Sequence, residues 1–235
     1  MPQTAENLAE QFNINREDQD KFALTSQQRT AAAQANGFFK NEIVPVVIPQ
    51  RKGDAVVVDT DEHPRASTTA EALAKLKPVV KADGTVTAGN ASGINDGAAA
   101  LLIASDEAVA QHGLKPRAKI IGSTVVGVEP RIMGFGPAPA IKKLLAQTGL
   151  TLEQMDVIEL NEAFAAQALA CTRDLGIEDG SEKVNPNGGA IALGHPLGAS
   201  GARLVTTALN QLEQTGGKYA LCSMCIGVGQ GIALI

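Results

Sequence analysis

Short apolar runs alternate with segments of helical periodicity along the second part of the chain. Runs rich in Val, Ile and Leu predict strands at 100–104, 119–128, 156–160, 219–223 and 231–235. Apolar residues at helical spacing predict helices at 106–112, 139–148, 163–175 and 199–214. Because strands that alternate with helices are typical of layered α/β proteins, we expect an α/β domain over residues 90–235.

The first part of the chain is more irregular. Its pattern predicts a polar helix that ends before Gly37, a natural stop, followed by two extended runs separated by a turn. Prolines then interrupt the pattern. The predicted elements are helices at 16–36 and 69–77 and extended runs at 43–48 and 55–58. We therefore expect a separate, irregular subdomain over residues 1–89.

Composition and charge narrow the class of protein. The 235 residues are 44% hydrophobic but only 3% aromatic, so aliphatic side chains must build the core. A net charge of −5 gives no basic surface for nucleic acid. No apolar run approaches the ~20 residues of a membrane span, and the N-terminus lacks the pattern of a signal peptide. Three cysteines are too few for a disulfide framework, so we expect a cytoplasmic protein.

A glycine-rich loop around one histidine is the most informative feature of the chain. It spans residues 187–203, and Pro196 stiffens the turn beside His195. The pKa of an imidazole suits proton transfer near neutral pH. His195 is therefore a candidate general base for a thiol, or a hydrogen-bond donor to a carbonyl oxygen that gains charge. The competing interpretation is a histidine whose hydrogen bonds are satisfied within a tight turn.

A Cys-x-Gly-x-Gly turn lies between two predicted strands near the C-terminus. It begins at Cys225, and the backbone N–H of Gly227 is a candidate donor to an oxyanion. A buried structural cysteine is the competing interpretation. Cys222 and Cys225 also form a Cys-x-x-Cys pair, which is weak evidence for zinc or redox chemistry because there is no second pair. Strand alternation places these two thiols on opposite faces, and we expect Cys171 and Cys222 to be core residues.

An asparagine and a glutamate follow the apolar run at 156–160. Strand ends of α/β sheets face ligand crevices, so Asn161 is a candidate for orienting a water molecule. A helix N-cap explains Asn161 equally well. Glu162 is interpreted as an acidic residue in the first turn of the following helix.

Two loops of small residues are candidates for ligand contacts. The loop at 91–97 lacks the Gly-Lys-Ser/Thr signature of a phosphate loop. It suits a thin ligand that lies along the backbone, although a tight turn explains it equally well. In the loop at 131–137, Met133 is an adaptable apolar contact, and surface charge alone explains Arg131.

Three motifs together resemble the active-site motifs of the thiolase family, in the family's order. They are Asn161-Glu162-Ala163-Phe164, the loop around His195, and the turn that begins at Cys225. The resemblance covers nearly the whole chain. It implies a thiolase-like C-terminal α/β domain in which helices pack on a mixed five-stranded sheet, preceded by part of an irregular loop subdomain.

The resemblance also implies a chemistry. Thiolases condense or cleave acyl-CoA thioesters by ping-pong acyl transfer through two cysteines, with coenzyme A and acyl-CoA as substrates and no permanently bound cofactor or metal. On this pattern His195 activates the nucleophile and helps to form an oxyanion hole, Cys225 is the acid/base cysteine, and Asn161 holds a water molecule. Family members are typically homodimers or homotetramers. Positions that match contacts to CoA are Ser92, Met133, Ala163 and Phe164 in the pantetheine channel and Arg65 near the nucleotide.

The residues around Met133 and Cys225 are most similar to those of thiolases that act on 3-oxoadipyl-CoA in the breakdown of aromatic acids. A general degradative 3-ketoacyl-CoA thiolase is an alternative. A non-catalytic unit that binds CoA or assists assembly is another, from a different class of function.

The chain also departs from the family pattern. In the family, the acylated cysteine lies in an N-terminal α/β half that precedes every motif seen here. Cys171 lies in a helical pattern without a glycine turn and does not match that nucleophile. We therefore expect the N-terminal thiolase domain to be absent and the isolated chain to be inactive. We also expect a large exposed apolar face, or pairing with a separately encoded N-terminal half.

Overall fold

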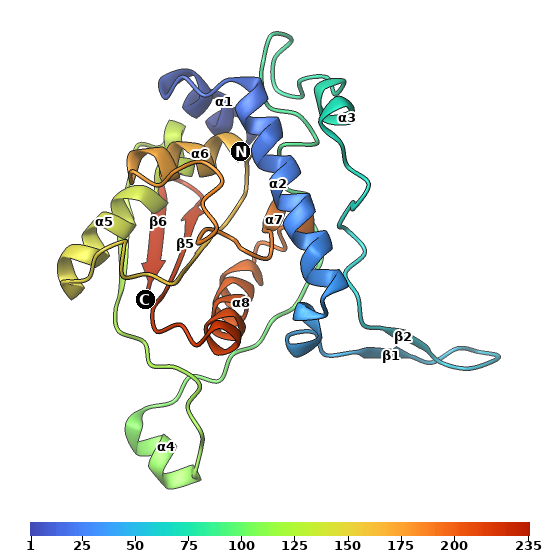
Figure 1. Cartoon of the computed structure of the whole chain (residues 1–235), viewed down its shortest axis with the longest axis vertical. Helices are drawn as coiled ribbons and strands as arrows, with labels where there is room; N and C mark the ends of the chain where they lie inside the picture. Colours follow the sequence, from blue (N-terminus) through green and yellow to red (C-terminus); the bar gives the residue numbers. More distant parts are fainter.

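A mixed four-stranded sheet forms the centre of the structure (Figure 1). The computed structural model describes all residues from 1 to 235. The strand order is β3-β6-β5-β4, in which β4 and β5 are parallel and the other neighbours are antiparallel. The strands are β3 (Ser123–Gly127), β4 (Val157–Leu160), β5 (Ala220–Ile226) and β6 (Gln230–Leu234).

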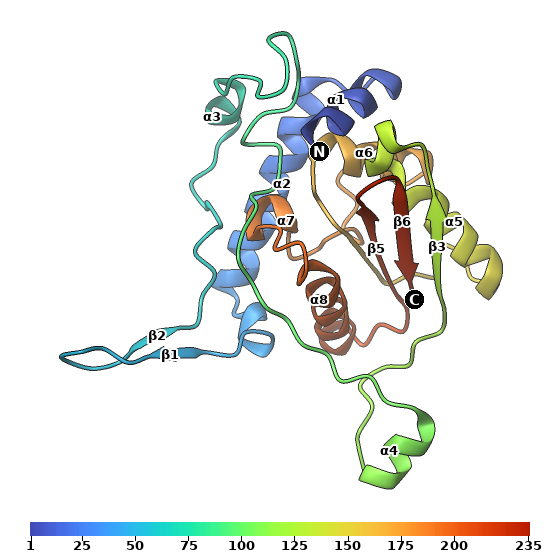
Figure 2. The same ribbon diagram turned by 180° about the vertical axis from the view of Figure 1, so that it is seen from behind.

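Helices cover both faces of this sheet. On one face, side chains such as Ile158 pack against α5 (Pro137–Thr148) and α6 (Ala165–Asp174). On the other face, Val157 packs against α8 (Ser200–Thr215). Because successive side chains of a strand point to opposite faces, these neighbours belong to two different cores. The sheet is therefore the middle layer of an α/β/α arrangement, as the view from behind also shows (Figure 2).

Two N-terminal helices pack against α6. They are α1 (Pro2–Gln11) and the long α2 (Arg16–Ala35), which also runs beside the short α7 (Ala190–Leu193). Helix α2 begins where sequence chemistry favours it, because the side chain of Asn15 accepts a hydrogen bond from the Asp18 N–H at 2.8 Å. None of the helices combines the length and the apolar character that crossing a bilayer requires.

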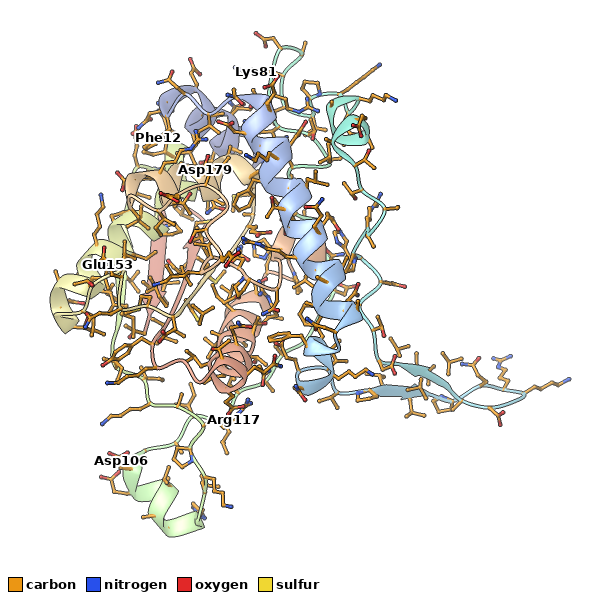
Figure 3. All side chains as sticks on the ribbon, in the orientation of Figure 1. Phe12, Lys81, Asp106, Arg117, Glu153 and Asp179 are labelled. Atoms are coloured by element: carbon orange, nitrogen blue, oxygen red, sulfur yellow. The ribbon has the colours of Figure 1, made fainter.

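Two segments project from this body. The antiparallel hairpin of β1 (Val46–Ile48) and β2 (Val56–Val58) extends to one side with exposed side chains. Helix α4 (Asp106–His112) lies at the end of a long excursion, where Figure 3 labels Asp106. The remaining short elements are η1 (Phe38–Asn41), α3 (Ala70–Ala74) and η2 (Pro130–Phe135).

The predicted helices and most predicted strands are present within a few residues of their expected bounds. The expected strand at 100–104 is wrong, because this run has no partner strand and Leu102 and Ile103 are 82% and 73% exposed. An apolar run becomes a strand only where a neighbour accepts its backbone hydrogen bonds. The sheet therefore has four strands rather than the expected five. Helices α1 and α7 have no counterpart among the predicted elements.

Candidate active site

The end of β4 positions Asn161. Its backbone N–H donates to the carbonyl oxygen of Ser223 on the neighbouring β5 at 2.9 Å, and the residue is fully buried. The N-cap of α6 is Phe164, so the helix-cap interpretation of Asn161 is wrong. Its side-chain Nδ2 lies 3.3 Å from the imidazole Nε2 of His195. Its Oδ1 has no partner in the chain and is free to accept a hydrogen bond from water or substrate.

His195 lies in the turn between α7 and α8. Its backbone N–H donates to the carbonyl oxygen of Gly93 at 3.0 Å, which joins the histidine turn to the small-residue loop at 91–97. The hydroxyl of Ser200 donates to the Pro196 carbonyl at 3.0 Å, so the Ser200 oxygen accepts from His195 Nδ1–H at 2.6 Å. This tautomer leaves Nε2 as a lone-pair acceptor, which faces Asn161.

The surroundings of His195 favour the neutral imidazole. Burial lowers its pKa below the usual value, and the positive guanidinium of Arg203 on α8 lowers it further. The two side chains hydrogen-bonded to the ring nitrogens, Asn161 and Ser200, carry no charge. At neutral pH the ring is therefore unprotonated at Nε2 and able to accept a proton.

Cys225 lies on β5 in a small apolar cluster. It packs with Met133 of η2 and with Ala163 and Phe164, which follow Asn161 in the chain. Burial raises the pKa of the Cys225 thiol to about 11, because the charged thiolate is poorly solvated there. The sulfur is therefore protonated at neutral pH and can give a proton to a carbanion formed beside it.

The turn after Cys225 presents a free backbone donor. The N–H of Gly227 has no hydrogen-bond acceptor within the chain. Val228 adopts a φ of +70°, a left-handed conformation that is unfavourable for a β-branched residue. Pairing of Ile226 with Gln230 closes the strands around this turn and holds it in place. The strained turn leaves the Gly227 N–H available for an oxyanion.

The structure brings most of the predicted CoA-contact residues together. The backbone N–H and the hydroxyl of Ser92 both donate to the carbonyl oxygen of Ala163, at 3.0 and 3.1 Å. Ala91 and Phe164 form a β-bridge, so the loop at 91–97 lies against the Cys225 cluster.

Arg65 is not part of this group. Its side chain is exposed, and its backbone N–H donates to the side chain of Gln27 on α2 at 2.8 Å. No hydrogen bond or ion pair joins Arg65 to the residues around Cys225. Its expected role near the CoA nucleotide stays a prediction.

The other two cysteines are core residues, as the sequence predicted. Cys222 packs in the α8 core, on the opposite face from Cys225. Cys171 lies in the core between the sheet, α5 and α6, where its thiol donates to the Gly134 carbonyl at 3.6 Å. Burial raises the pKa of both thiols. Neither is placed or ionised as a nucleophile requires.

Two residues beside His195 and Asn161 make contacts that sequence reasoning did not predict. Ser200, which fixes the histidine tautomer, is signalled only by its place at the start of a predicted helix. Glu162 is fully buried and lies before the N-cap of α6, so its interpretation as an acidic residue in the first turn of that helix is wrong. Its carboxylate accepts hydrogen bonds from three different segments of the chain.

Two family models match the chain. The model of the thiolase N-terminal domain matches residues 1–107, and the model of the thiolase C-terminal domain matches residues 114–235. Because the N-terminal model matches residues 1–107, the expected absence of the N-terminal thiolase domain is not confirmed. The division at residue 90 stays a prediction.

Curated relatives match over the whole chain. A beta-ketoadipyl-CoA thiolase of Acinetobacter baylyi is 84% identical over all 235 residues, and a 3-oxoadipyl-CoA/3-oxo-5,6-dehydrosuberyl-CoA thiolase of Escherichia coli is 60% identical. The chain spans 59% of the length of each of these relatives.

Solved structures show the same fold. The acetyl-CoA acetyltransferase of Bacillus anthracis superposes with a TM-score of 0.94 at 49% identity, and the match covers 99% of this chain and 58% of that one. Human mitochondrial 3-ketoacyl-CoA thiolase in complex with CoA superposes with a TM-score of 0.90 at 48% identity, and the match covers 100% of this chain and 57% of that one.

Proposed function

Because the chain belongs to the thiolase family, we propose that it carries the proton-transfer residues of a CoA-dependent acyltransferase. The reaction is the cleavage of a β-ketoacyl-CoA by CoA to acetyl-CoA and a shortened acyl-CoA, with 3-oxoadipyl-CoA as the substrate. One observation carries the proposal: Asn161, at the end of β4, contacts the Nε2 of a neutral, buried His195, and Cys225 lies on the neighbouring strand β5. The names of the most similar relatives support the choice of substrate.

Each residue has a role in this reaction. His195 Nε2 takes the proton of the attacking thiol, and the resulting N–H then donates to the oxygen on which charge develops. When the carbon–carbon bond of the substrate breaks, its electron pair passes to the α-carbon as an enolate. The protonated Cys225 gives its proton to that carbon, and Gly227 N–H and a water on Asn161 Oδ1 are candidate donors to the oxyanions.

The thiol that becomes acylated is proposed to be none of the three cysteines of this chain. Cys171 and Cys222 are packed in cores away from the Cys225 cluster, and burial raises the pKa of each. The purified 235-residue chain is therefore expected to show no thiolase turnover. Measurable CoA-dependent cleavage by this chain alone would overturn that expectation.

CoA is proposed to bind as a substrate rather than as a resident cofactor. The cluster of Ser92, Met133, Ala163 and Phe164 around Cys225 supports a pantetheine channel at this place. Arg65 near the nucleotide, a homodimeric or homotetrameric assembly, an N-terminal half as partner and a cytoplasmic location remain parts of the proposal.

The test uses a chimera in which residues 1–235 replace the matching part of the Acinetobacter baylyi relative. CoA-dependent cleavage of 3-oxoadipyl-CoA and of a long linear 3-ketoacyl-CoA is measured side by side. We expect a clear preference for 3-oxoadipyl-CoA. Equal or faster cleavage of the linear substrate supports the general degradative alternative, which the similarity to human 3-ketoacyl-CoA thiolase favours. An inactive chimera that still binds CoA supports the non-catalytic alternative.

A further inference from the structure

Two consecutive residues after β4 make contacts with different segments. Asn161 contacts the imidazole of His195, whereas the carboxylate of Glu162 contacts none of the reacting groups. Glu162 Oε2 accepts from the Ser26 hydroxyl at 2.6 Å and from the Ile191 N–H at 3.2 Å. Glu162 Oε1 accepts from the Asn185 amide at 2.8 Å. Both oxygens of this fully buried carboxylate are therefore satisfied.

The bond to Ile191 reaches the segment that carries the histidine. Ile191 lies in the first turn of α7, where a backbone N–H has no acceptor within the helix. Helix α7 spans Ala190–Leu193, and its C-cap Gly194 directly precedes His195. The carboxylate thus fixes the start of a one-turn helix whose end determines where the imidazole lies.

The backbone before α7 approaches Glu162 so closely that only glycine fits. A Cβ at Gly189 would lie 2.6 Å from Glu162 Oε1, and a Cβ at Gly188 would lie 2.6 Å from the Ser26 carbonyl oxygen. Gly188 also has a φ of +79°. The Ser26 hydroxyl oxygen accepts a hydrogen bond from the Gly189 N–H at 3.1 Å. The same hydroxyl therefore links α2 both to Glu162 and to the backbone at Gly189. Gly189 thus allows the close approach to Glu162, and Gly188 allows the close approach to α2.

We propose that Glu162 is a positioning residue, which holds His195 at Asn161 by anchoring α7 to the end of β4. This inference rests on the proposed function, because the proton transfer it supports is that of His195. Glu162 itself touches neither the substrate atoms nor the imidazole.

A glutamine cannot replace this carboxylate without loss of a bond. Asn185 cannot turn over to accommodate an amide, because its Nδ2 donates to the Leu160 carbonyl at 2.8 Å and its Oδ1 accepts from the Leu160 N–H at 2.9 Å. In Glu162→Gln, the new NH₂ therefore faces either the Asn185 Nδ2–H or the Ile191 N–H. Two donors then face each other, and α7 loses part of its anchor while side-chain volume is unchanged.

The matched control is Glu6→Gln. Glu6 is also a buried carboxylate with three hydrogen bonds, from the Thr85 N–H, the Val86 N–H and the Thr85 hydroxyl. It joins α1 to the segment at 85–86 and makes no contact with α7 or His195. A merely structural role for Glu162 predicts that both variants behave alike.

The first measurement is the pH profile of kcat in the chimera. We expect Glu162→Gln to lower kcat by roughly 10–100-fold, with the KM for CoA within about threefold, because a small misplacement of a catalytic group has effects of this size. Burial is the main cause of the lowered pKa of His195, and the positive charge of Arg203 lowers that pKa further. A loosened, better solvated imidazole has a pKa closer to its usual value, so the acid limb moves to higher pH. Glu6→Gln is expected to leave both kcat and the limb unchanged.

The second measurement uses the 235-residue chain and needs no activity. The titration of the His195 ring is followed by NMR, with Ser26→Ala as a milder variant that removes one donor to Glu162. Both Glu162→Gln and Ser26→Ala should raise the pKa of His195, and Glu6→Gln should not. An unchanged His195 titration in Glu162→Gln and Ser26→Ala overturns the inference. An inactive wild-type chimera overturns the proposed function instead, and the NMR result still decides on Glu162.

Discussion

The strand β4 and the run at 100–104 are similar in sequence and opposite in structure. Both are short and rich in aliphatic residues, yet every residue of β4 is buried, whereas Leu102 and Ile103 face solvent. Strand β4 pairs in parallel with β5 and is covered by helices on both faces. The run at 100–104 has no partner strand. An aliphatic run therefore forms a buried strand only when both a neighbouring strand and a covering layer are present, whereas β1 and β2 pair with each other but stay exposed.

The residues of the candidate site lie in the packed part of the molecule, around β4 and β5. Asn161 follows β4, Cys225 lies on β5, and His195 precedes α8. The pKa of His195 and that of Cys225 are both shifted by burial, which the exposed segments cannot provide. The protonation states of His195 and Cys225 therefore depend on the helices and loops that bury the ends of β4 and β5.

The largest expected effect on activity distinguishes a histidine of the packed site, His195, from a histidine of an exposed segment, His112. His195→Ala in the chimera should lower kcat/KM by about 10²–10⁴-fold, the usual range for a general base. His112→Ala, on the exposed helix α4, should leave kcat/KM within about twofold. Steady-state thiolysis of 3-oxoadipyl-CoA measures both. Equal losses in the two variants would contradict the assignment of the base.

A smaller effect separates the two aliphatic runs themselves. Leu160→Ala should lower the free energy of unfolding of the chain by about 2–5 kcal/mol, because it removes a fully buried side chain from the core under α5 and α6. Leu102→Ala should change it by less than about 0.5 kcal/mol, since that side chain is exposed. Urea unfolding of the 235-residue chain checks the pair. A large loss in Leu102→Ala would show that the run at 100–104 is packed in solution.

The next effect concerns pH and a buried carboxyl on β4. Burial raises the pKa of Glu159 to about 8, and the Arg203 guanidinium at 3.0 Å only partly offsets this. A carboxyl whose pKa is higher in the folded than in the unfolded state stabilises the fold below pH ~4.5, and this contribution is lost as pH rises through ~8. The wild-type chain should therefore lose on the order of 2–4 kcal/mol between pH 5 and pH 8.5.

Glu159→Gln should flatten this fall, as unfolding in urea across the same pH range will show. The control is Glu107→Gln on α4, where an exposed carboxyl has a lowered pKa and cannot cause a fall with rising pH. A decline that persists unchanged in Glu159→Gln would assign the pH dependence to another group.

The sequence predicts the motifs of the site better than the contacts that support them. His195, Asn161 and Cys225 stand out because glycines and strand ends surround them in the chain. The role of Glu162 is invisible in the sequence, since its partner Ser26 is 136 residues away. Likewise, the composition of the run at 100–104 indicates a strand, but only the three-dimensional arrangement shows that no partner lies beside it. Local patterns specify propensity, and long-range contacts decide burial.

The most direct test of the separate roles of His195 and Cys225 measures the two stages of the reaction one by one in the chimera. Rapid quenching after mixing with an acyl-CoA gives the burst of CoA released when the nucleophile is acylated, and addition of the second acyl-CoA gives the rate of carbon–carbon bond formation. Cys225→Ser should leave the burst largely intact and severely slow bond formation, because the α-proton passes to a thiolate in this direction and a serine hydroxyl ionises far less readily than a thiol. His195→Ala should slow both stages. Equal loss of the acylation burst in the two variants would contradict the separate roles of His195 and Cys225.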